Sequence, residues 1–280
     1  MELTAQFIIV IVAISFLCEY MDATLGMGYG TTLTPLFLLM GFSPGQIVPA
    51  ILVSQLICGF MASFFHHAEG NVNFRPRNRD ALHIRDLIRP VTYFRNLRRS
   101  LPQHLKVALL FGVCSTVGAV VSVLVAVKIP VFWLKMYIGV LVLSMGILIL
   151  VMFNKKISFS YRKVAGLGLL AAFNKGLSGG GYGPVVTAGQ ILTGIEGKNA
   201  IGITALAEGI TCFAGVVMYL LIGSKETNWS LTPWIVLGAV FSVPLCAKSV
   251  KFIPERKLKA AIAVLTIILG TLTILKTVGL

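Results

Sequence analysis

Two glycine-rich phrases interrupt apolar stretches of this chain, and their residue types are suited to binding an anion. The first reads LGMGYGTTLTPL (25–36) and the second LSGGGYGPVVTA (177–188). The first turn of a helix carries unpaired N–H groups and a partial positive charge, and glycine lets a ligand approach that backbone closely. The phrases therefore predict two helix starts that bind a small oxyanion. The alternative is that the glycines only permit tight helix packing.

The candidate substrate-binding residues are those of the phrases together with one nearby lysine. They are Gly26, Gly28, Tyr29, Gly30, Thr31, Lys175, Gly179, Gly180, Gly181, Tyr182 and Gly183. Pro184 stands close to the expected helix start of the second phrase, where proline is favoured, and Thr31 and Thr32 can cap the matching start in the first. Uncharged hydrogen bonds could also come from Asn174, Ser178, Gln190 and Thr211.

Charged residues inside the apolar segments are the candidates for ion coupling. A charge at the centre of a bilayer costs about 2.5–3.5 kcal/mol on insertion scales, so it usually has a function. Lys175 lies four residues before Gly179, and Asp22 lies four before Gly26. Lys175 either adds a positive charge to the anion site or pairs with Asp22 or Glu19. The ion-coupling candidates are Asp22, Glu208 and Gln55, the counterpart of Glu208 in the first half. Glu208 is either a proton carrier or a neutral or paired structural residue.

The composition is that of a polytopic membrane protein. Of the 280 residues, 56% are hydrophobic and 12% are charged, about half the charged fraction of a soluble domain. The net charge of +14 is clustered between apolar runs, which argues against a nucleic-acid partner. The expected spanning segments are 5–25, 47–66, 105–127, 132–153, 164–177, 199–222, 231–247 and 258–278. Two shorter apolar pieces, 31–41 and 184–194, would each reach only about 16 Å, half of a bilayer.

The N-terminal 22 residues have neither a basic region nor a small-residue cleavage site, so we expect a retained membrane segment rather than a signal peptide.

The chain aligns with itself, which predicts two repeats. At an offset of 153 positions, 26–41 matches 179–194 with seven identities in 16 positions. At an offset of 124, 129–150 matches 253–275, with an identical Ile-Pro pair at the start. The difference in offset places an insertion of about 29 residues in the first half, within about 69–103. We therefore expect membrane repeats over 1–155 and 160–280.

The distribution of basic residues predicts that the repeats are inverted. Arginines and lysines are concentrated in the insertion, in the link 155–163 and in 248–259, whereas 124–135 has two lysines and 223–230 has one. By the positive-inside rule the first three segments are cytoplasmic and the last two are external. This works if each glycine phrase forms a re-entrant hairpin. The expected fold is all-α, with two inverted repeats, broken helices and both termini outside.

The remaining polar features have simpler readings. The arginine-rich part of the insertion (79–100) fits either a helix on the anionic inner leaflet or a solvated loop. The cysteines are expected to be small buried apolar residues: Cys18, Cys58, Cys114, Cys212 and Cys246. The histidines are expected at the cytoplasmic boundary without metal-ligand spacing: His66, His67, His83 and His104. There is no phosphate-binding loop, and no metal or cofactor is expected.

In these features the chain resembles the TauE/SafE sulfite exporter family. The resemblance lies in GMGYGTTLTPLFLLMGFSP, NKGLSGGGYGPVVTAGQILTG, HHAEGNVNF and the closing AKSVKFIPERKLKAAIAVLTIILGTLTILK. It implies proton- or sodium-linked secondary transport of sulfite or another sulfur-containing anion, such as a sulfonate, across the cytoplasmic membrane, commonly as export. The alternatives are a carrier of a carboxylate or another oxyanion, an intramembrane enzyme, or a sensor acting through the arginine-rich insertion.

Overall fold

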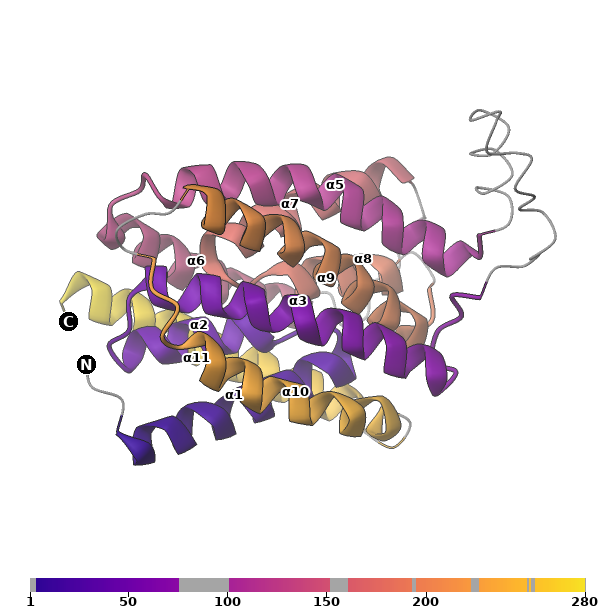
Figure 1. Cartoon of the computed structure of the whole chain (residues 1–280), viewed down its shortest axis with the longest axis horizontal. Coiled ribbons are helices and arrows are strands. Elements are labelled where there is room, and N and C mark those ends of the chain that lie inside the picture. The colour runs from indigo at the N-terminus through magenta and orange to yellow at the C-terminus, as the bar shows by residue number, and fades with distance from the viewer. Residues whose placement is uncertain are drawn as a thin grey trace.

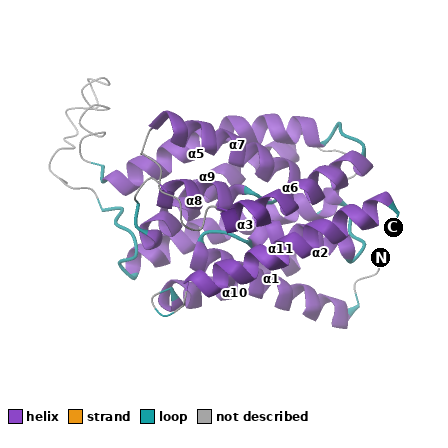
Figure 2. Cartoon of the chain, turned by 180° about the vertical axis from the view of Figure 1, so that it is seen from behind, coloured by secondary structure: helices purple, strands orange, loops and turns teal. Residues whose placement is uncertain are grey.

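The structure is a computed structural model, and it describes residues 4–75, 101–151, 161–192, 195–222, 227–250, 252 and 255–279. These residues form helices and no strand (Figure 2). In chain order the helices are α1 (Ala5–Leu25), α2 (Tyr29–Leu39), α3 (Pro44–Ala68), α5 (Gln103–Ala126), α6 (Val131–Val151), α7 (Tyr161–Ser178), α8 (Tyr182–Leu192), α9 (Gly197–Ile222), α10 (Thr232–Ser249) and α11 (Glu255–Val278). Figure 1 shows most of them lying side by side as one elongated bundle.

Six of the described helices are long and apolar enough to cross a bilayer: α1, α3, α5, α6, α9 and α10. A further apolar stretch of α11, Ile262–Val278, is shorter. Many of their large apolar side chains face outward, for example Leu221, Phe241 and Val113. Such an exposed apolar surface is suited to lipid contact and not to water. The expectation of an all-helical, multi-pass membrane protein is confirmed.

The first glycine phrase separates α1 from α2. Gly28 has a φ of 127°, a backbone conformation that side-chain-bearing residues rarely adopt, so glycine is required there. After α2 the ring of Phe42 lies 5.8 Å from the ring of Phe7, near the beginning of α1. Helix α2 therefore brings the chain back toward the end of the bundle at which α1 begins.

The second phrase separates α7 from α8 in the same manner. Gly181 has a φ of 80°. Gly189, near the end of α8, packs against Leu167 in the first half of α7. Helix α8 thus runs back along α7, as α2 runs back toward the start of α1.

Small residues allow the long helices to pack closely. A methyl group at Gly59 of α3 would lie 2.8–3.0 Å from the backbone of α9 at Ala205 and Gly209. A methyl group at Gly270 of α11 would lie 2.6 Å from the backbone nitrogen of Leu143 in α6. Close backbone approach through small residues is the usual way in which membrane helices associate.

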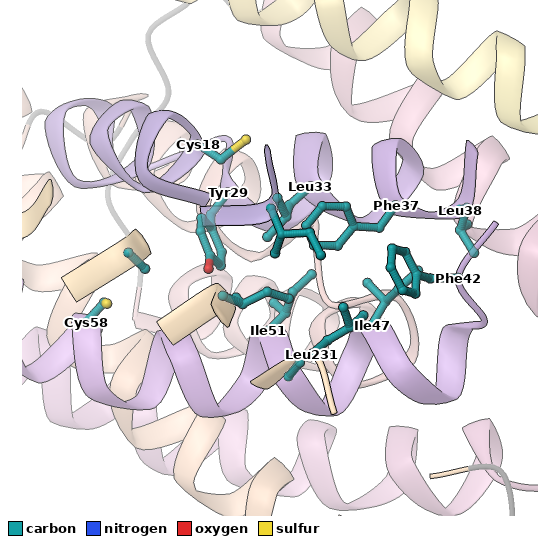
Figure 3. Packing of buried hydrophobic residues seen from close by; sticks show 14 of the residues in the cluster. Cys18, Tyr29, Leu33, Phe37, Leu38, Phe42, Ile47, Ile51, Cys58 and Leu231 are labelled. Atoms are coloured by element: carbon teal, nitrogen blue, oxygen red, sulfur yellow. The ribbon is translucent and has the colours of Figure 1, made fainter. Parts of the chain in front are cut away.

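The largest apolar cluster surrounds the first phrase. Figure 3 shows Leu33 and Phe37 on α2 stacked toward Ile47 and Ile51 of α3, with the ring of Tyr29 at the start of the row. All of these side chains are buried. The burial fixes the start of α2 within the bundle, where a glycine-rich turn would otherwise be poorly held.

At the end of the bundle where α3 ends, His66, His67 and Asn71 close the turn that follows this helix. His66, in the last turn of α3, is fully buried, and its Nε2 atom lies 2.8 Å from the carbonyl oxygen of Ala23. The amide of Asn71 donates to the carbonyl of Ala247, at 3.0 Å, and lies 3.1 Å from the Nδ1 atom of His66. These contacts join α3 to α1 and α10, which explains the polar HHAEGN sequence.

His67 and His104 stay near the surface and accept backbone N–H groups of Phe74 and Asn73. His83 and 76–100 lie outside the described residues. Four cysteines are buried as expected, and Cys114 is half-buried.

Candidate functional site

The two glycine phrases cross each other inside the bundle. A methyl group on Gly30 would overlap the carbonyl of Gly179, and one on Gly180 would lie 2.7 Å from the carbonyl carbon of Gly30 and from the nitrogen of Thr31. A methyl group on Gly183 would overlap the carbonyl oxygen of Gly26. The beginnings of α2 and α8, 153 positions apart in the sequence, are therefore packed backbone to backbone.

A reciprocal pair of threonine hydrogen bonds fixes this crossing. The Thr34 hydroxyl of α2 donates to the carbonyl of Ser178 at 2.8 Å. The Thr187 hydroxyl of α8 donates to the carbonyl of Gly26 at 2.6 Å. Thr34 and Thr187 are equivalent positions in the self-alignment. Each hydroxyl donates to a carbonyl at the C-terminal end of the helix that precedes the other glycine phrase, α7 for Thr34 and α1 for Thr187. The last carbonyls of a helix have no donor within that helix.

The glycines of the phrases thus have two kinds of surroundings. Gly30, Gly180 and Gly183 face the backbone of the opposite phrase, which makes them packing residues. A methyl group on Gly28 or Gly181 would lie 3.3–4.0 Å from neighbouring side chains. The neighbours of Gly28 are Ile262 and Met21, whereas those of Gly181 are Asn174 and Leu141. The surroundings are therefore apolar at the first phrase and partly polar at the second.

At the start of α2 the chain supplies its own anion. The backbone N–H of Tyr29 donates to the Asp22 carboxylate at 3.2 Å. The Thr31 hydroxyl turns back to the carbonyl of Gly28, at 3.2 Å. Thr32 is buried, and its hydroxyl has no hydrogen-bond partner among the described residues. A carboxylate at a helix N-terminus satisfies an otherwise unpaired N–H group and interacts favourably with the helix dipole.

At the start of α8, Lys175 occupies the position equivalent to Asp22, so the second phrase lacks the carboxylate that the first has at this position. The Tyr137 hydroxyl of α6 donates to the Oδ1 atom of Asn174 at 2.6 Å, and this bond assigns the amide Nδ2 atom to the side facing Gly181. The Ser178 hydroxyl accepts the N–H of Gly180 at 3.1 Å. An amide donor, that of Asn174, therefore faces the turn that leads into α8.

The two phrase tyrosines are anchored by hydroxyl groups. The hydroxyl of Tyr29 is hydrogen-bonded to Ser54 of α3 at 2.8 Å (its ring is seen in Figure 3). The hydroxyl of Tyr182 lies 3.2 Å from that of Ser115 in α5 and accepts from Thr211 of α9 at 3.4 Å. Both rings are buried, so each tyrosine ties its helix start to a long neighbouring helix.

Buried charges lie beside the crossing. The Nζ atom of Lys175 and the Oε1 atom of Glu208 form an ion pair at 2.6 Å, with side chains 2% and 4% exposed. The Gln55 amide donates to the carboxylate of Glu19 at 2.5 Å. The carboxyl groups of Glu208, Glu19 and Asp22 line one crevice of about 10 Å³, which also touches Gly26. Such a volume holds at most one water molecule.

Most candidate side chains from the sequence are brought together, with different partners from those expected. Lys175 pairs with Glu208, and not with Asp22 or Glu19. Gln190 donates to Thr204, whose hydroxyl is also bonded to Thr187, so it supports α8 against α9. Tyr137 and Ser115 were not singled out, although a lone hydroxyl in an apolar helix that needs a buried partner is a usable signal.

This architecture defines a multi-pass α-helical membrane protein whose buried polar and charged groups gather where two glycine-rich turns meet. Residues 90–273 match the family profile for the sulfite exporter TauE/SafE, which includes the second phrase. The chain belongs to the TauE/SafE family of membrane transporters, and the resemblance carried by its glycine phrases is confirmed. It is a transporter, and not an enzyme.

The chain is also similar to the "Probable membrane transporter protein YtnM" of Bacillus subtilis (strain 168). The two are 23% identical over 260 residues, which cover 89% of this chain and 76% of that protein. No solved structure matches the chain.

Proposed function

We propose that this protein is a secondary transporter, working as an exporter, of sulfite or a related sulfur-containing anion such as a sulfonate. The observation that carries the proposal is the crossing of the two glycine phrases, which brings the starts of α2 and α8 together inside the bundle. Helix N-termini with glycine backbone are suited to small oxyanions. The family's name supplies the sulfur chemistry.

The transporter is proposed to consist of two inverted repeats, 1–155 and 160–280, with a re-entrant hairpin in each. Three findings support this arrangement: the reciprocal bonds of Thr34 and Thr187, the return of α2 toward the start of α1, and the return of α8 along α7. Alternating access in such transporters is a movement of one repeat relative to the other around a fixed site.

The orientation follows from the links between helices. The basic segments 69–103, 155–163 and 248–259 lie between helices in the sequence, and described helix ends beside them, those of α3, α5 and α10, lie at one end of the bundle (Figure 1). The beginning of α1 and the end of α11 lie at the other end (Figure 1), where Lys276 of α11 donates to the carbonyl of Leu39. We therefore place both termini outside the cell, with the basic segments in the cytoplasm.

Within the crossing, the start of α8 is the better place for the anion. Asp22 already takes the N–H of Tyr29 at the start of α2, and a second negative charge there would be repelled. The Asn174 amide, which Tyr137 orients, faces Gly181, and the first turn of α8 begins at the next residue. The sulfur oxygens are proposed to bind these donors.

The ion pair of Lys175 and Glu208 is proposed to couple transport to protons. Lys175 directly follows Asn174 in α7, four residues before Gly179. A proton on Glu208 would end the attraction that holds the ammonium group, which could then attract the anion. The crevice that Glu208 shares with Asp22 and Glu19 brings three carboxyl groups to one narrow space, between which a proton could pass.

Anion binding to purified protein tests the site. Sulfite, sulfate, thiosulfate, a small sulfonate and a dicarboxylate are titrated while thermal stability is followed. We expect stabilisation by a sulfur oxyanion, lost in Gly181→Val and retained in Gly166→Val, because a methyl group at exposed Gly166 would meet nothing within 4 Å. Stabilisation that persists in Gly181→Val would place the site elsewhere. A response to the dicarboxylate alone would change the substrate class.

Transport at different pH values tests the coupling. Glu208→Gln, assayed in proteoliposomes with an imposed pH gradient, should transport without dependence on that gradient. An unchanged pH profile in this variant would exclude Glu208 as the proton carrier.

A further inference from the structure

A second cavity lies at the end of the bundle where both termini are found, and nothing so far assigns a role to it. Its volume is about 360 Å³. It is formed by the start of α3, the end of α5, the start of α6 and the end of α9. We propose that it is a vestibule that attracts and binds a small oxyanion before the anion enters the crossing or after it leaves.

Among the described residues of the cavity wall, the one charged side chain is positive. Lys128, an exposed residue in the turn between α5 and α6, lines it. The first turns of α3 and α6 contribute Pro44, Gly45 and Val131 to the wall, so two long helices direct the positive ends of their dipoles toward it. None of the described residues that line the cavity is acidic. A concave site with charges of one sign concentrates ligands of the opposite sign.

The cavity also reaches toward the glycine phrases. Tyr219 of α9 lies in its wall, is nearly fully buried, and donates its hydroxyl to the carbonyl of Gly176 at 3.3 Å. Gly176 directly follows Lys175 and precedes Gly179 by three residues. Leu134 lines the cavity and belongs to the same apolar cluster as Leu177. Tyr219 thus links the cavity wall to the residue that directly precedes the second phrase.

The size of the cavity selects the kind of ligand. Its volume is about twelve times the share of one water molecule in the liquid, roughly 30 Å³, so a sulfonate or sulfate fits together with part of its hydration shell. One lysine and a set of partly solvated helix ends attract such an ion without desolvating it. This arrangement is suited to weak capture and fast release. The inference goes beyond the proposed site and rests on the proposed function only in treating the cavity as the mouth of the anion path.

Cysteine modification tests the vestibule independently of transport. Thr227, half-exposed in the cavity wall, is replaced by cysteine in the full-length, detergent-purified protein carrying Cys114→Ala. The modification rates by two methanethiosulfonate reagents, the anionic ethylsulfonate and the cationic ethyltrimethylammonium, are compared at low salt. Ser230→Cys, exposed in the same loop region but not lining the cavity, is the reference.

We expect the anionic-to-cationic rate ratio at Thr227→Cys to exceed the reference by about fivefold, the effect of one unit charge roughly 7–8 Å away in water. Lys128→Gln should bring the ratio down to the reference value. Lys135→Gln, which removes a lysine that lines a different pocket at this end, should leave it unchanged. Equal ratios at both cysteines, or a ratio unaffected by Lys128→Gln, would overturn the vestibule.

The vestibule and the proposed function fail separately. A raised ratio in a protein that no sulfur oxyanion stabilises would retain the vestibule and reject the sulfur substrate. Stabilisation by a sulfur oxyanion without a raised ratio would retain the substrate and reject the vestibule.

Discussion

The ion pair of Lys175 and Glu208 gives the most direct test of the charge arrangement. Its atoms are 2.6 Å apart, and both side chains are almost fully buried. Glu208→Gln removes the partner of a buried ammonium group, and Lys175→Met removes the partner of a buried carboxylate. Breaking a buried pair from one side typically costs about 3–5 kcal/mol, whereas replacing both charges by uncharged groups is often nearly neutral. Each single variant should therefore be less stable than the double variant.

The assay is a double-mutant cycle on purified protein in detergent. For a chain of this size, each kcal/mol lowers the melting temperature by about 2–4 °C. The single variants should then melt about 6–20 °C below the wild type, and the double variant should recover most of the loss. The interaction energy from the cycle should be on the order of 3 kcal/mol. Lys198→Met, at an exposed lysine near the start of α9, serves as the control and should change little.

Additivity would refute this reasoning. If both single variants lose less than about 1 kcal/mol and the double variant loses their sum, the two charges are solvated in solution and do not depend on each other. Glu208 would then have no attractive partner to give up on protonation. The proposed coupling between proton uptake and the release of Lys175 would fail with it.

Three further predictions concern the crossing and the insertion. Gly30→Ala should prevent stable folding, because its methyl group would overlap the carbonyl of Gly179, whereas Gly166→Ala should be neutral in the same melting assay. Thr34→Val and Thr187→Val should each lower the unfolding free energy by about 1–3 kcal/mol, since each leaves a buried carbonyl without its donor; equal stability of either variant and the wild type would contradict this. Deleting 76–100 should leave anion transport in proteoliposomes intact, and loss of transport in a folded variant would favour a role for the insertion.

The overall architecture could be predicted because its causes are local. Apolar runs of about 20 residues set the long helices, and the observed bounds of α1, α9 and α10 agree with the expected segments within a few residues. The ends of α1 and α7 could be located because glycine sequences of this kind do not continue a helix. The self-alignment paired Thr34 with Thr187 before any contact was known.

The side-chain partners could not be predicted, because they depend on how α7 and α9 are rotated against each other. From the sequence, Asp22 and Glu19 were the expected partners for Lys175. In the structure, the orientation of α9 against α7 places Glu208 next to Lys175 instead. The burial of His66 escaped prediction for the same reason, since its partners, Ala23 and Asn71, come from α1 and from the turn after α3. The periodicity of apolar residues assigns a residue to a helix. It does not determine which residue of a neighbouring helix will face it.

Asp22 in the first hairpin and Lys175 in the second occupy equivalent positions. This difference gives the two similar hairpins different roles. In the first hairpin the acidic side chain is held by the N–H of Tyr29, so the start of α2 is neutralised from within. In the second, the basic side chain is held by Glu208 of α9, and we propose that the N–H groups at the start of α8 are left for the anion. Two symmetric anion sites would place two negative charges within one crossing. In the proposed mechanism, one internal carboxylate and one open site avoid that repulsion, so that a single anion is carried in each cycle.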